Sequence, residues 1–379
     1  SPSVQKVIVV RHLADKMPVN MAAGRDVWWS DFVAGQPAEC ATVSMPAETP
    51  AALLFTSGTT GKPKGTVHFH RDVIAMCDCF PRSCLAPAKD DIFIGSPPLA
   101  FTFGLGGLVL FPLRIGASTV LLEKATPDDI LGAIAKFGVT ICFTAPTFYR
   151  QMAALVPKYR VVSLRKSVSA GEALPDATRQ LWKEASGLEM LDGIGATEMF
   201  HIFISAAGAD VRAGAIGKVV PGYQARVVDE QGHELPRGTV GRLAVIGPTG
   251  CRYLDDPRQS QYVRDGWNFP GDTFLQDDEG YFHYQARDDD MIITAGYNVG
   301  GPEVEDALLL HPAVAECGVV AKPDDERGMI VKAYCVLRSG HAASPDLGTQ
   351  LQDHVKTTLA PYKYPRDIEF VTQLPRTET

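Results

Sequence analysis

The chain has 379 residues, of which 45% are hydrophobic and 21% charged, and its formal net charge is −8. This composition is typical of a globular protein, so it excludes wholesale disorder and allows two or three domains. The acidic balance argues against a general binder of nucleic acid or of anionic membranes. No apolar run reaches the ~20 residues that span a bilayer, and the first residues lack the cleavage-site pattern of a signal peptide.

Eight cysteines are a modest number for a chain of this length, and they favour a reducing compartment. We therefore expect a cytoplasmic protein. Cys77, Cys79 and Cys84 lie close together, but no second pair at metal-ligand spacing accompanies them. Because the surrounding stretch is apolar and helix-like, buried free thiols are a better interpretation than a metal site.

Strand-like and helix-like stretches alternate from about residue 50 onward. This alternation predicts an α/β fold whose largely parallel sheet carries helices on both faces. Three of the expected helices open with proline near the first turn, where proline is well tolerated. The expected strands are Ala51–Phe55, Ile92–Ile94, Thr119–Leu122, Val139–Phe143, Lys166–Ser169 and Glu189–Leu191, and the expected helices are Val67–Phe80, Pro127–Lys136, Pro146–Leu155 and Pro175–Ala185.

The pattern changes after about residue 214, where short strands separated by tight turns predict a mostly antiparallel β subdomain at about 214–286. A charged segment at 286–290 then leads into a small α+β region. We predict a large domain over residues 1–286 and a small, mobile domain over residues 287–379. The expected strands are Ala225–Val228, Gly241–Ile246, Tyr281–Tyr284, Met291–Thr294, Glu316–Val320 and Val331–Leu337, and the expected helices are Pro302–Leu310 and Leu347–Leu359.

The strongest local feature is the segment Thr56–Gly65, with the sequence TSGTTGKPKG. It lies between the expected strand Ala51–Phe55 and the expected helix Val67–Phe80. Its glycines permit close backbone approach, its hydroxyls can donate hydrogen bonds, and Lys62 and Lys64 are positively charged, which together suit a polyphosphate. The segment matches neither a Walker A loop nor G-x-G-x-x-G. Since a flexible surface loop has the same composition, the residues alone leave both interpretations open.

The same decapeptide resembles the signature loop of the adenylate-forming superfamily, which includes acyl-CoA synthetases, the adenylation domains of peptide synthetases, and luciferases. Other segments resemble motifs of that superfamily, in the same order along the chain. They are Ser169–Pro175, Gly193–Glu198, Pro270–Asp272, Arg287–Met291, Ala295–Asn298, Pro302–Glu305 and Pro361–Pro365. Within the superfamily, Phe103–Gly106 and Asp192–Phe203 are most similar to benzoate- and 2-aminobenzoate-CoA ligases.

This resemblance implies a two-step reaction. A carboxylate attacks the α-phosphate of ATP to give acyl-AMP and pyrophosphate, and the thiol of CoA then displaces AMP. The implied cofactors are ATP/AMP, Mg²⁺ and coenzyme A, and the implied substrate is a small aromatic carboxylic acid such as benzoate or 2-aminobenzoate. Neither nucleic acid nor a membrane is an expected partner, and a homodimer is one expectation for the assembly.

The resemblance also implies nucleotide-binding and catalytic residues. Glu198 would bind Mg²⁺, Thr197 would contact the α-phosphate and Asp272 would accept hydrogen bonds from the ribose hydroxyls. Without the resemblance, Glu198 could be an acidic residue at a helix start and Asp272 a turn residue. Asp289 would be the hinge of the small domain. The β- and γ-phosphates would contact Thr56, Ser57, Gly58, Thr59, Thr60 and Lys64. The remaining nucleotide and CoA contacts would come from Gly171, Glu172, Ala173, Asp192, Gly193, Ile194, Arg287, Gly296 and Tyr297.

The acyl pocket is expected at Phe101, Phe103, Gly104, His201 and Ile202. Taken alone, such aromatic and histidine residues are more often ordinary core, and the similarity to benzoate ligases is what favours a pocket. An aromatic acid needs a flat apolar slot with a polar group nearby. We assign no acid–base role to His201, because a carboxylate substrate is already ionised at pH 7.

The sequence departs from the superfamily pattern at several places. Position 194 is Ile where many members have an adenine-stacking Tyr, and position 286 is Ala where Gly is usual. The chain ends at Pro375–Thr379, just before the expected Gly-Lys, and Lys332 and Lys363 do not match that lysine. Little chain precedes Thr56. We therefore expect a fragment that lacks an N-terminal portion, is cut before the catalytic-lysine motif, and adenylates poorly.

Three other functions fit the same residues. The acyl group could pass to the thiol of a carrier protein rather than to free CoA. The acid could be a medium-chain fatty acid, although His201 and the nearby aromatic residues argue against a long tunnel. A nucleotide-binding pseudoenzyme is a more distant alternative, since only the missing lysine supports it.

Overall fold

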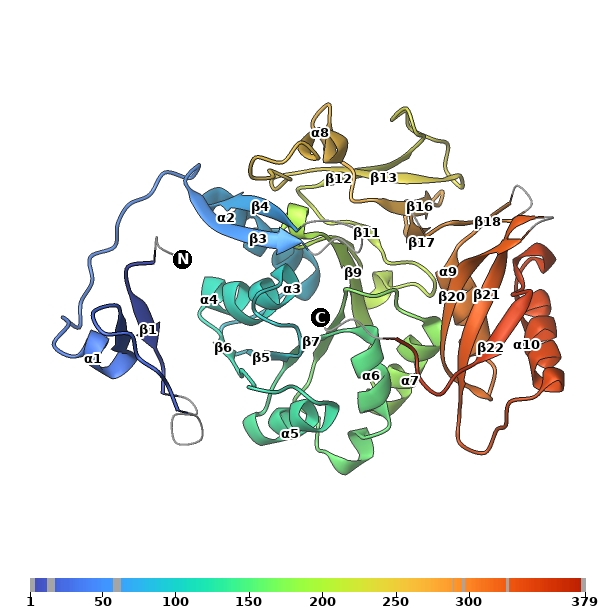
Figure 1. The fold of residues 1–379 in the computed structure, drawn as a ribbon, viewed down its shortest axis with the longest axis horizontal. Coiled ribbons are helices and arrows are strands. Elements are labelled where there is room, and N and C mark those ends of the chain that lie inside the picture. The colour runs from blue at the N-terminus through green and yellow to red at the C-terminus, as the bar shows by residue number, and fades with distance from the viewer. Residues whose placement is uncertain are drawn as a thin grey trace. The chain divides into compact units, whose positions relative to one another are not determined.

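The computed structural model describes residues 4–11, 18–56, 63–288, 290–294, 297–324 and 327–375 (Figure 1). The chain forms two compact units, Ser1–Pro46 and Ala47–Thr379. In the first unit, β1 (Val7–Val9) pairs in parallel with β2 (Asp26–Trp28), and α1 (Trp29–Val33) follows. All other elements belong to the second unit. No helix in the described part of the chain is long and apolar enough to cross a membrane.

The central sheet of the second unit has seven strands in the order β11-β10-β9-β8-β7-β5-β6. The five strands from β9 to β6 run parallel, and β10 and β11 add an antiparallel edge. The prediction of a largely parallel sheet is confirmed, but the expected strand at 119–122 is wrong beyond Thr119. The strands are β5 (Ile92–Gly95), β6 (Ser118–Thr119), β7 (Ile141–Thr144), β8 (Lys166–Ser169), β9 (Met190–Gly195), β10 (Ile202–Ser205) and β11 (Lys218–Val219).

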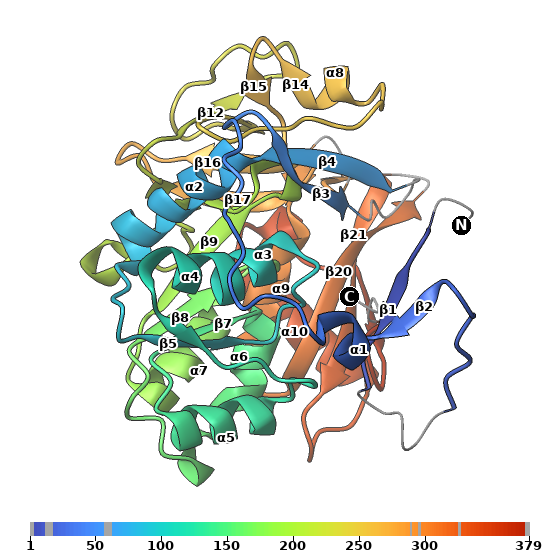
Figure 2. The ribbon, with the colours of Figure 1, turned by 90° about the vertical axis from the view of Figure 1, so that its left-hand side faces the viewer.

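Helices cover both faces of this sheet, because successive strand residues point to opposite sides. On β7, Phe143 packs in one core with Phe111, whereas its neighbour Cys142 packs in a second core with Ile134 and Trp182. In Figure 2, α3 and α4 lie above the parallel strands and α5 and α7 below them. The helices are α2 (His70–Asp78), α3 (Thr102–Leu105), α4 (Phe111–Ile115), α5 (Pro127–Phe137), α6 (Pro146–Ala153) and α7 (Asp176–Ser186).

Local sequence explains the ends of α5. The Thr126 hydroxyl accepts a hydrogen bond from the Asp129 amide, the Asp129 carboxylate accepts one from the Thr126 amide, and Pro127 occupies the first turn. Gly138 ends the helix with a φ of +66°, a conformation that favours glycine. Shorter helical turns are η1 (Pro81–Leu85), η2 (Gly106–Leu110), η3 (Val156–Lys158), η4 (Thr197–Met199), η5 (Gly208–Asp210) and η6 (Pro361–Lys363).

The expected helix at 67–80 is wrong at its start. Residues up to Phe69 belong to β4 (Lys64–Phe69), which pairs antiparallel with β3 (Pro50–Thr56), and α2 begins only at His70. The loop residues 57–62 lie outside the described residues, but they join two strands of a hairpin rather than a strand and a helix. β3 is partly exposed, and Phe55 near its end is 60% exposed. Periodicity cannot separate a short apolar strand from a helix start, which explains the error.

The second large sheet is entirely antiparallel, with the order β14-β15-β13-β16-β17 and β12 paired to β13. The strands expected at 225–228 and 241–246 are confirmed, and the one expected at 281–284 extends to Arg287. The elements are β12 (Gln224–Val228), β13 (Val240–Ile246), α8 (Gln259–Tyr262), β14 (Val263–Arg264), β15 (Trp267–Asn268), β16 (Asp272–Gln276) and β17 (Phe282–Arg287).

The last region contains a third sheet, in the order β19-β18-β21-β20 with β22 paired to β21. Its core contains Val304 of α9, Val331 of β21 and Leu351 of α10. The expected strands and helices of this region are confirmed, whereas the domain boundary at 286/287, which falls inside β17, stays a prediction. The elements are β18 (Ile292–Thr294), β19 (Tyr297–Val299), α9 (Gly301–Leu309), β20 (Val314–Asp324), β21 (Gly328–Leu337), α10 (Pro345–Thr358) and β22 (Asp367–Phe370).

The three clustered cysteines are free thiols. Cys77, on α2, is buried in the core, and burial raises the pKa of its thiol to about 12. The prediction of a buried thiol is therefore right for Cys77, whereas Cys79 and Cys84 are only half-buried. Within the described residues, no group of three or more His, Cys, Asp or Glu side chains is arranged to hold a metal ion.

Candidate active site

Two cavities adjoin where the parallel strands β8 and β9 end, a common ligand position in open α/β sheets. The larger, of about 320 Å³, is the polar cavity, and the smaller, of about 160 Å³, is the apolar cavity. Gly171 and Gly195 line both. The polar cavity is otherwise lined by Glu172, Ala173, Asp192, Gly193, Ile194, Ile216, Asp272, Tyr284 and Arg287. The apolar cavity is otherwise lined by Thr102, Phe103, Ala170, Ala196, Thr197, His201 and Ile202.

The polar cavity collects eight of the residues expected at a nucleotide site. They come from the loop after β8, from β9, and from β16 and β17 of the antiparallel sheet: Gly171, Glu172, Ala173, Asp192, Gly193, Ile194, Asp272 and Arg287. Sequence reasoning missed Gly195, Ile216 and Tyr284. Gly195 lies within the recognised Gly193–Glu198 segment, whereas no motif marks Ile216 or Tyr284.

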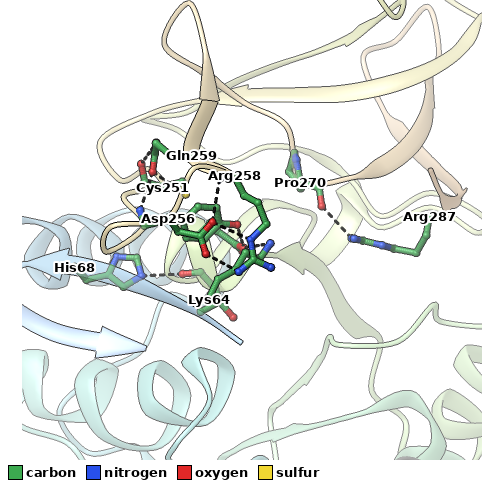
Figure 3. Close-up of polar contacts among 11 residues, drawn as sticks. Lys64, His68, Cys251, Asp256, Arg258, Gln259, Pro270 and Arg287 are labelled. Carbon is green, nitrogen blue, oxygen red and sulfur yellow. Dashed lines mark hydrogen bonds and ion pairs between the residues drawn. The ribbon is translucent and has the colours of Figure 1, made fainter. Parts of the chain in front are cut away.

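Two buried carboxyl groups face this polar cavity. Nη1 of Arg287 donates a hydrogen bond to Oδ1 of Asp272 at 3.0 Å. It also donates one to the carbonyl of Pro270 at 3.0 Å (Figure 3). Burial raises the pKa of Asp272 to about 6, and the Arg287 charge opposes that rise. Burial likewise raises the pKa of Asp192 to about 6, opposed by the charge of Arg179. Oδ1 of Asp192 is buried and has no hydrogen-bond partner among the described residues.

A second polar cluster surrounds Glu198, which lies on the turn η4 after β9. The Tyr253 hydroxyl donates to Oε1 of Glu198 at 2.5 Å, and Nζ of Lys64 lies 3.7 Å from the same oxygen. Lys64 also lies 4.8 Å from the centroid of the Tyr253 ring. Burial raises the pKa of the Tyr253 hydroxyl, and the Glu198 charge adds to that rise, so Tyr253 stays a donor. Tyr253 was missed because nothing in the sequence links it to a residue 55 positions earlier.

The turn that bears Glu198 is anchored from the β3–β4 hairpin. Nε2 of the buried His68 donates to the carbonyl oxygen of Thr197 at 2.8 Å (Figure 3), and its ring stacks on Phe200 with centroids 4.2 Å apart. A lone carboxylate such as Glu198 suits Mg²⁺, which is usually bound by one or two carboxylates together with phosphate oxygens and water. The residues present are therefore compatible with Mg²⁺ shared with a polyphosphate.

Among the described residues that line the apolar cavity, His201 is the only one whose ring carries polar atoms. The imidazole is 3% exposed, and its centroid lies 4.6 Å from Phe111 and 5.9 Å from both Phe80 and Phe103. Burial lowers the pKa of His201 to about 3, so the ring is neutral at neutral pH. Neither ring nitrogen has a hydrogen-bond partner among the described residues. The cavity therefore suits an uncharged, flat group.

Several expected site residues lie elsewhere or cannot be located. Phe101 is 36% exposed and lines neither cavity. Gly104 packs so closely that a Cβ atom there would collide with the carbonyl oxygen of Pro98, which is a structural reason for glycine. Tyr297 is 55% exposed and stacks on Tyr362. Thr56 ends β3, with its hydroxyl buried and without a partner among the described residues. Ser57, Gly58, Thr59, Thr60, Asp289 and Gly296 lie outside the described residues.

The fold thus places a polar cavity and a smaller apolar cavity side by side at the carboxyl ends of the parallel strands. The AMP-binding enzyme model matches residues 1–252, and the model of the AMP-binding enzyme C-terminal domain matches residues 303–379. The chain belongs to the AMP-binding enzyme family.

Individual relatives narrow the similarity. A benzoate–CoA ligase of Thauera aromatica is 40% identical over 385 residues, which cover all of this chain and 72% of that protein. A crystal structure of the anthranilate CoA ligase AuaEII in complex with anthranoyl-AMP has a TM-score of 0.90 and 36% identity, covering 99% of this chain and 71% of that one. A benzoate CoA ligase from Burkholderia xenovorans LB400 has a TM-score of 0.86 and 32% identity, covering 98% and 77%. The predicted resemblance is therefore confirmed.

Proposed function

We propose that this chain is an aryl-CoA ligase that activates benzoate or a substituted benzoate, such as 2-aminobenzoate, with ATP and transfers it to CoA. Family membership and the similarity to benzoate and anthranilate ligases support an AMP-forming acid–CoA ligase. The observation that carries the aryl assignment is the small cavity of about 160 Å³ beside the polar one, lined by Phe103, Ile202 and a neutral His201.

The polar cavity would hold the AMP part of the substrate. Asp272 would accept hydrogen bonds from both ribose hydroxyls, since a carboxylate offers two acceptor oxygens, while Arg287 keeps it oriented. The unpaired Oδ1 of Asp192 would accept from the adenine amine. Ile194 would pack on the adenine ring, where it offers dispersion contacts without aromatic stacking, and Glu172 would lie at its border.

The phosphates would lie at the cluster around Glu198. Lys64 would neutralise phosphate charge together with the hydroxyls of the loop 56–60, and Thr197 would contact the α-phosphate. Mg²⁺, when bound, would be held by Glu198 and would supply positive charge to the phosphates. Tyr253 and Lys64 both contact Glu198 and so limit the positions that its carboxylate can adopt.

In the first step, a carboxylate oxygen of the acid bonds to the α-phosphorus and pyrophosphate leaves. In the second, the sulfur of CoA bonds to the acyl carbon and AMP leaves. The protein would contribute by aligning the two reactants across the adjoining cavities and by neutralising phosphate charge. His201 would shape the pocket and need not accept a proton, since the acid enters ionised.

The second step would require the small domain, proposed as residues 287–379, to rotate about Asp289 so that Gly296 and Tyr297 reach the site. The exposed position of Tyr297, outside both cavities, supports such a rearrangement. The homodimer and the cytoplasmic location stay predictions.

The function is tested by titration calorimetry with three ligands: AMP, N-benzoylsulfamoyl-adenosine and N-octanoylsulfamoyl-adenosine. These adenylate mimics need no catalysis. We expect the benzoyl mimic to bind at least tenfold more tightly than either AMP or the octanoyl mimic. Equal affinities for all three would contradict the aryl assignment, and tighter octanoyl binding would favour a medium-chain acid. Mass spectrometry of the thioester, with CoA or a carrier protein as acceptor, then identifies the second substrate.

A further inference from the structure

Gly106 lies against the imidazole of His201. A Cβ atom at position 106 would lie 2.8 Å from Nε2 of His201 and closer still to Cδ2. Cβ atoms essentially never approach heavy atoms within 3.0 Å, so the imidazole occupies the space that any other residue at position 106 would need. Gly106 is buried, and it does not line the apolar cavity, whereas His201 does. The three heavy atoms nearest to such a Cβ atom all belong to His201, so a side chain at position 106 would act on that cavity through the imidazole.

The backbone at Gly106 does not itself require glycine. Its φ of −65° and ψ of −59° are ordinary right-handed helical values, which alanine adopts readily. Gly106 opens η2, a single π-helical turn, and such turns are rare and occur frequently at functional sites. The absence of a side chain at position 106 is thus explained by the contact with His201 and not by backbone conformation.

Three phenylalanine rings pack around the imidazole, and Phe103, with its ring centroid 5.9 Å away, is the one that also lines the apolar cavity. Phe111 meets it edge-on, with ring centroids 4.6 Å apart, and Phe80 stacks on it, with ring centroids 5.9 Å apart. Both are fully buried core residues. A methyl group at position 106 would therefore displace the ring toward the cavity of about 160 Å³, where the free volume lies.

We propose that Gly106 is a positioning residue that determines acyl specificity: by leaving room for the His201 imidazole, it keeps the apolar cavity large enough for an aromatic ring. This inference rests on the proposed function, in which that cavity binds the aryl group. It adds a residue that touches neither nucleotide nor acid. With glycine at position 106, the protein would bind a planar aromatic acid in preference to a small aliphatic one.

The test is Gly106→Ala, with calorimetric affinities for N-benzoylsulfamoyl-adenosine, N-acetylsulfamoyl-adenosine and AMP. We expect the benzoyl mimic to bind at least tenfold more weakly than it does to the unchanged protein. Affinities for the acetyl mimic and for AMP should change less than twofold, because neither fills the space next to His201. A uniform loss for all three ligands would overturn the proposal.

The matched control is Gly107→Ala, in the same turn. A Cβ atom there would lie 2.7 Å from Cδ1 of Phe143, a core residue that lines neither cavity. This variant should lose stability but keep its preference for the benzoyl mimic over AMP. If Gly107→Ala weakens benzoyl binding as much as Gly106→Ala does, general repacking is the cause and the proposal fails.

Removing the imidazole tests the contact itself. In a His201→Ala background, adding Gly106→Ala should change benzoyl affinity less than twofold, since there is no ring left to displace. If the single Gly106→Ala protein does not fold, the double variant should fold and bind AMP, and its failure to do so would overturn the proposal. Unchanged protein that binds the benzoyl mimic no better than AMP would instead contradict the proposed function itself.

Discussion

Ionisable groups in the two adjoining cavities have pKa values that are shifted in opposite directions for the same physical reason. Burial disfavours ions, so it raises the pKa of Asp192 and Asp272 to about 6 in the polar cavity and lowers that of His201 to about 3 in the apolar cavity. At pH 7 the carboxyls are still mostly ionised, helped by Arg179 and Arg287, while the imidazole is neutral. The comparison shows that supporting cations, and not burial alone, decide which cavity keeps a charge.

The largest expected effect comes from removing one charge from the polar cavity. Asp272→Asn should weaken AMP binding by about 3 kcal/mol, roughly 100-fold, because two hydrogen bonds to a charged acceptor are lost or weakened. Titration calorimetry measures this. The control is Asp288→Asn, whose carboxylate bonds Arg242 and Thr273 outside the cavity. A similar loss in both variants would argue against a ribose contact at Asp272.

The next effect is a pH dependence confined to the polar cavity. If the ligand needs the Asp272 carboxylate, a pKa of about 6 makes binding of N-benzoylsulfamoyl-adenosine at least about tenfold weaker at pH 5 than at pH 7.5, and Asp192, whose pKa is also about 6, would add to this loss. The preference for the benzoyl over the acetyl mimic should stay constant, because His201 titrates only near pH 3. Parallel titrations at pH 5, 6 and 7.5 measure both quantities.

Protein stability does not account for that loss. The pKa of Asp272 is higher in the folded protein than in the unfolded chain, so ionisation of this group destabilises the fold as the pH rises from about 4 to about 6. Lowering the pH to 5 reduces this destabilisation. Asp272→Asn should also remove the Asp272 share of the pH dependence. A preference for the benzoyl mimic that varies with pH between 5 and 7.5 would contradict the description of the apolar cavity.

A smaller effect is expected at Glu198. Tyr253→Phe removes one hydrogen bond to a buried carboxylate, worth about 1.5 kcal/mol, so we expect roughly tenfold weaker binding of ATP with Mg²⁺. The matched control is Tyr262→Phe, because the Tyr262 hydroxyl is buried without a hydrogen-bond partner among the described residues. That variant should bind within twofold of the unchanged protein. Equal losses would mean that Tyr253 does not act through Glu198.

The smallest expected effect is a gain in protein stability, whereas the changes above weaken ligand binding. His201→Leu should raise the free energy of unfolding by about 1 kcal/mol in the absence of ligand, because two buried nitrogens without partners are replaced by apolar atoms. Thermal unfolding measures it. His68→Leu should destabilise instead, since it removes the hydrogen bond to Thr197. If both variants lose stability alike, the unpaired nitrogens of His201 cost nothing.

Much of the fold could be predicted from the sequence, because strands and helices have periods that appear in the residues themselves. The exceptions are informative. The run Val67–Phe69 is short, with two apolar residues on either side of His68, so it fits a helix start and a strand equally well, and only pairing with β3 decides. The run at 120–122 is apolar, but its pairing with β5 ends at Thr119, apart from one hydrogen bond that the Val120 amide donates to the Phe93 carbonyl.

The residues of the candidate site also divide into those that the sequence identifies and those that only the structure reveals. Asp192, Asp272 and Arg287 stand in recognisable motifs, and the structure brings them to one cavity. Tyr253 stands in no recognised motif, and although Gly106 ends the recognised segment Phe103–Gly106, its role could not be predicted. The contacts of these two residues with Glu198 and His201 cross 55 and about 95 residues of chain and arise only when separate elements pack. Sequence motifs thus point to groups that meet ligands, but not to the residues that hold those groups in place.

The two glycines that line both cavities have a thermodynamic consequence. Gly171 has a φ of +89°, and a Cβ atom at Gly195 would lie 2.7 Å from the carbonyl oxygen of His201, so neither position readily accepts a side chain. With no side chain between them, the cavities can bind the two halves of one covalently joined molecule. Two halves that each bind at about 1 mM would together reach about 1 μM or tighter, a chelate effect. The joined intermediate would then stay bound while AMP alone dissociates readily.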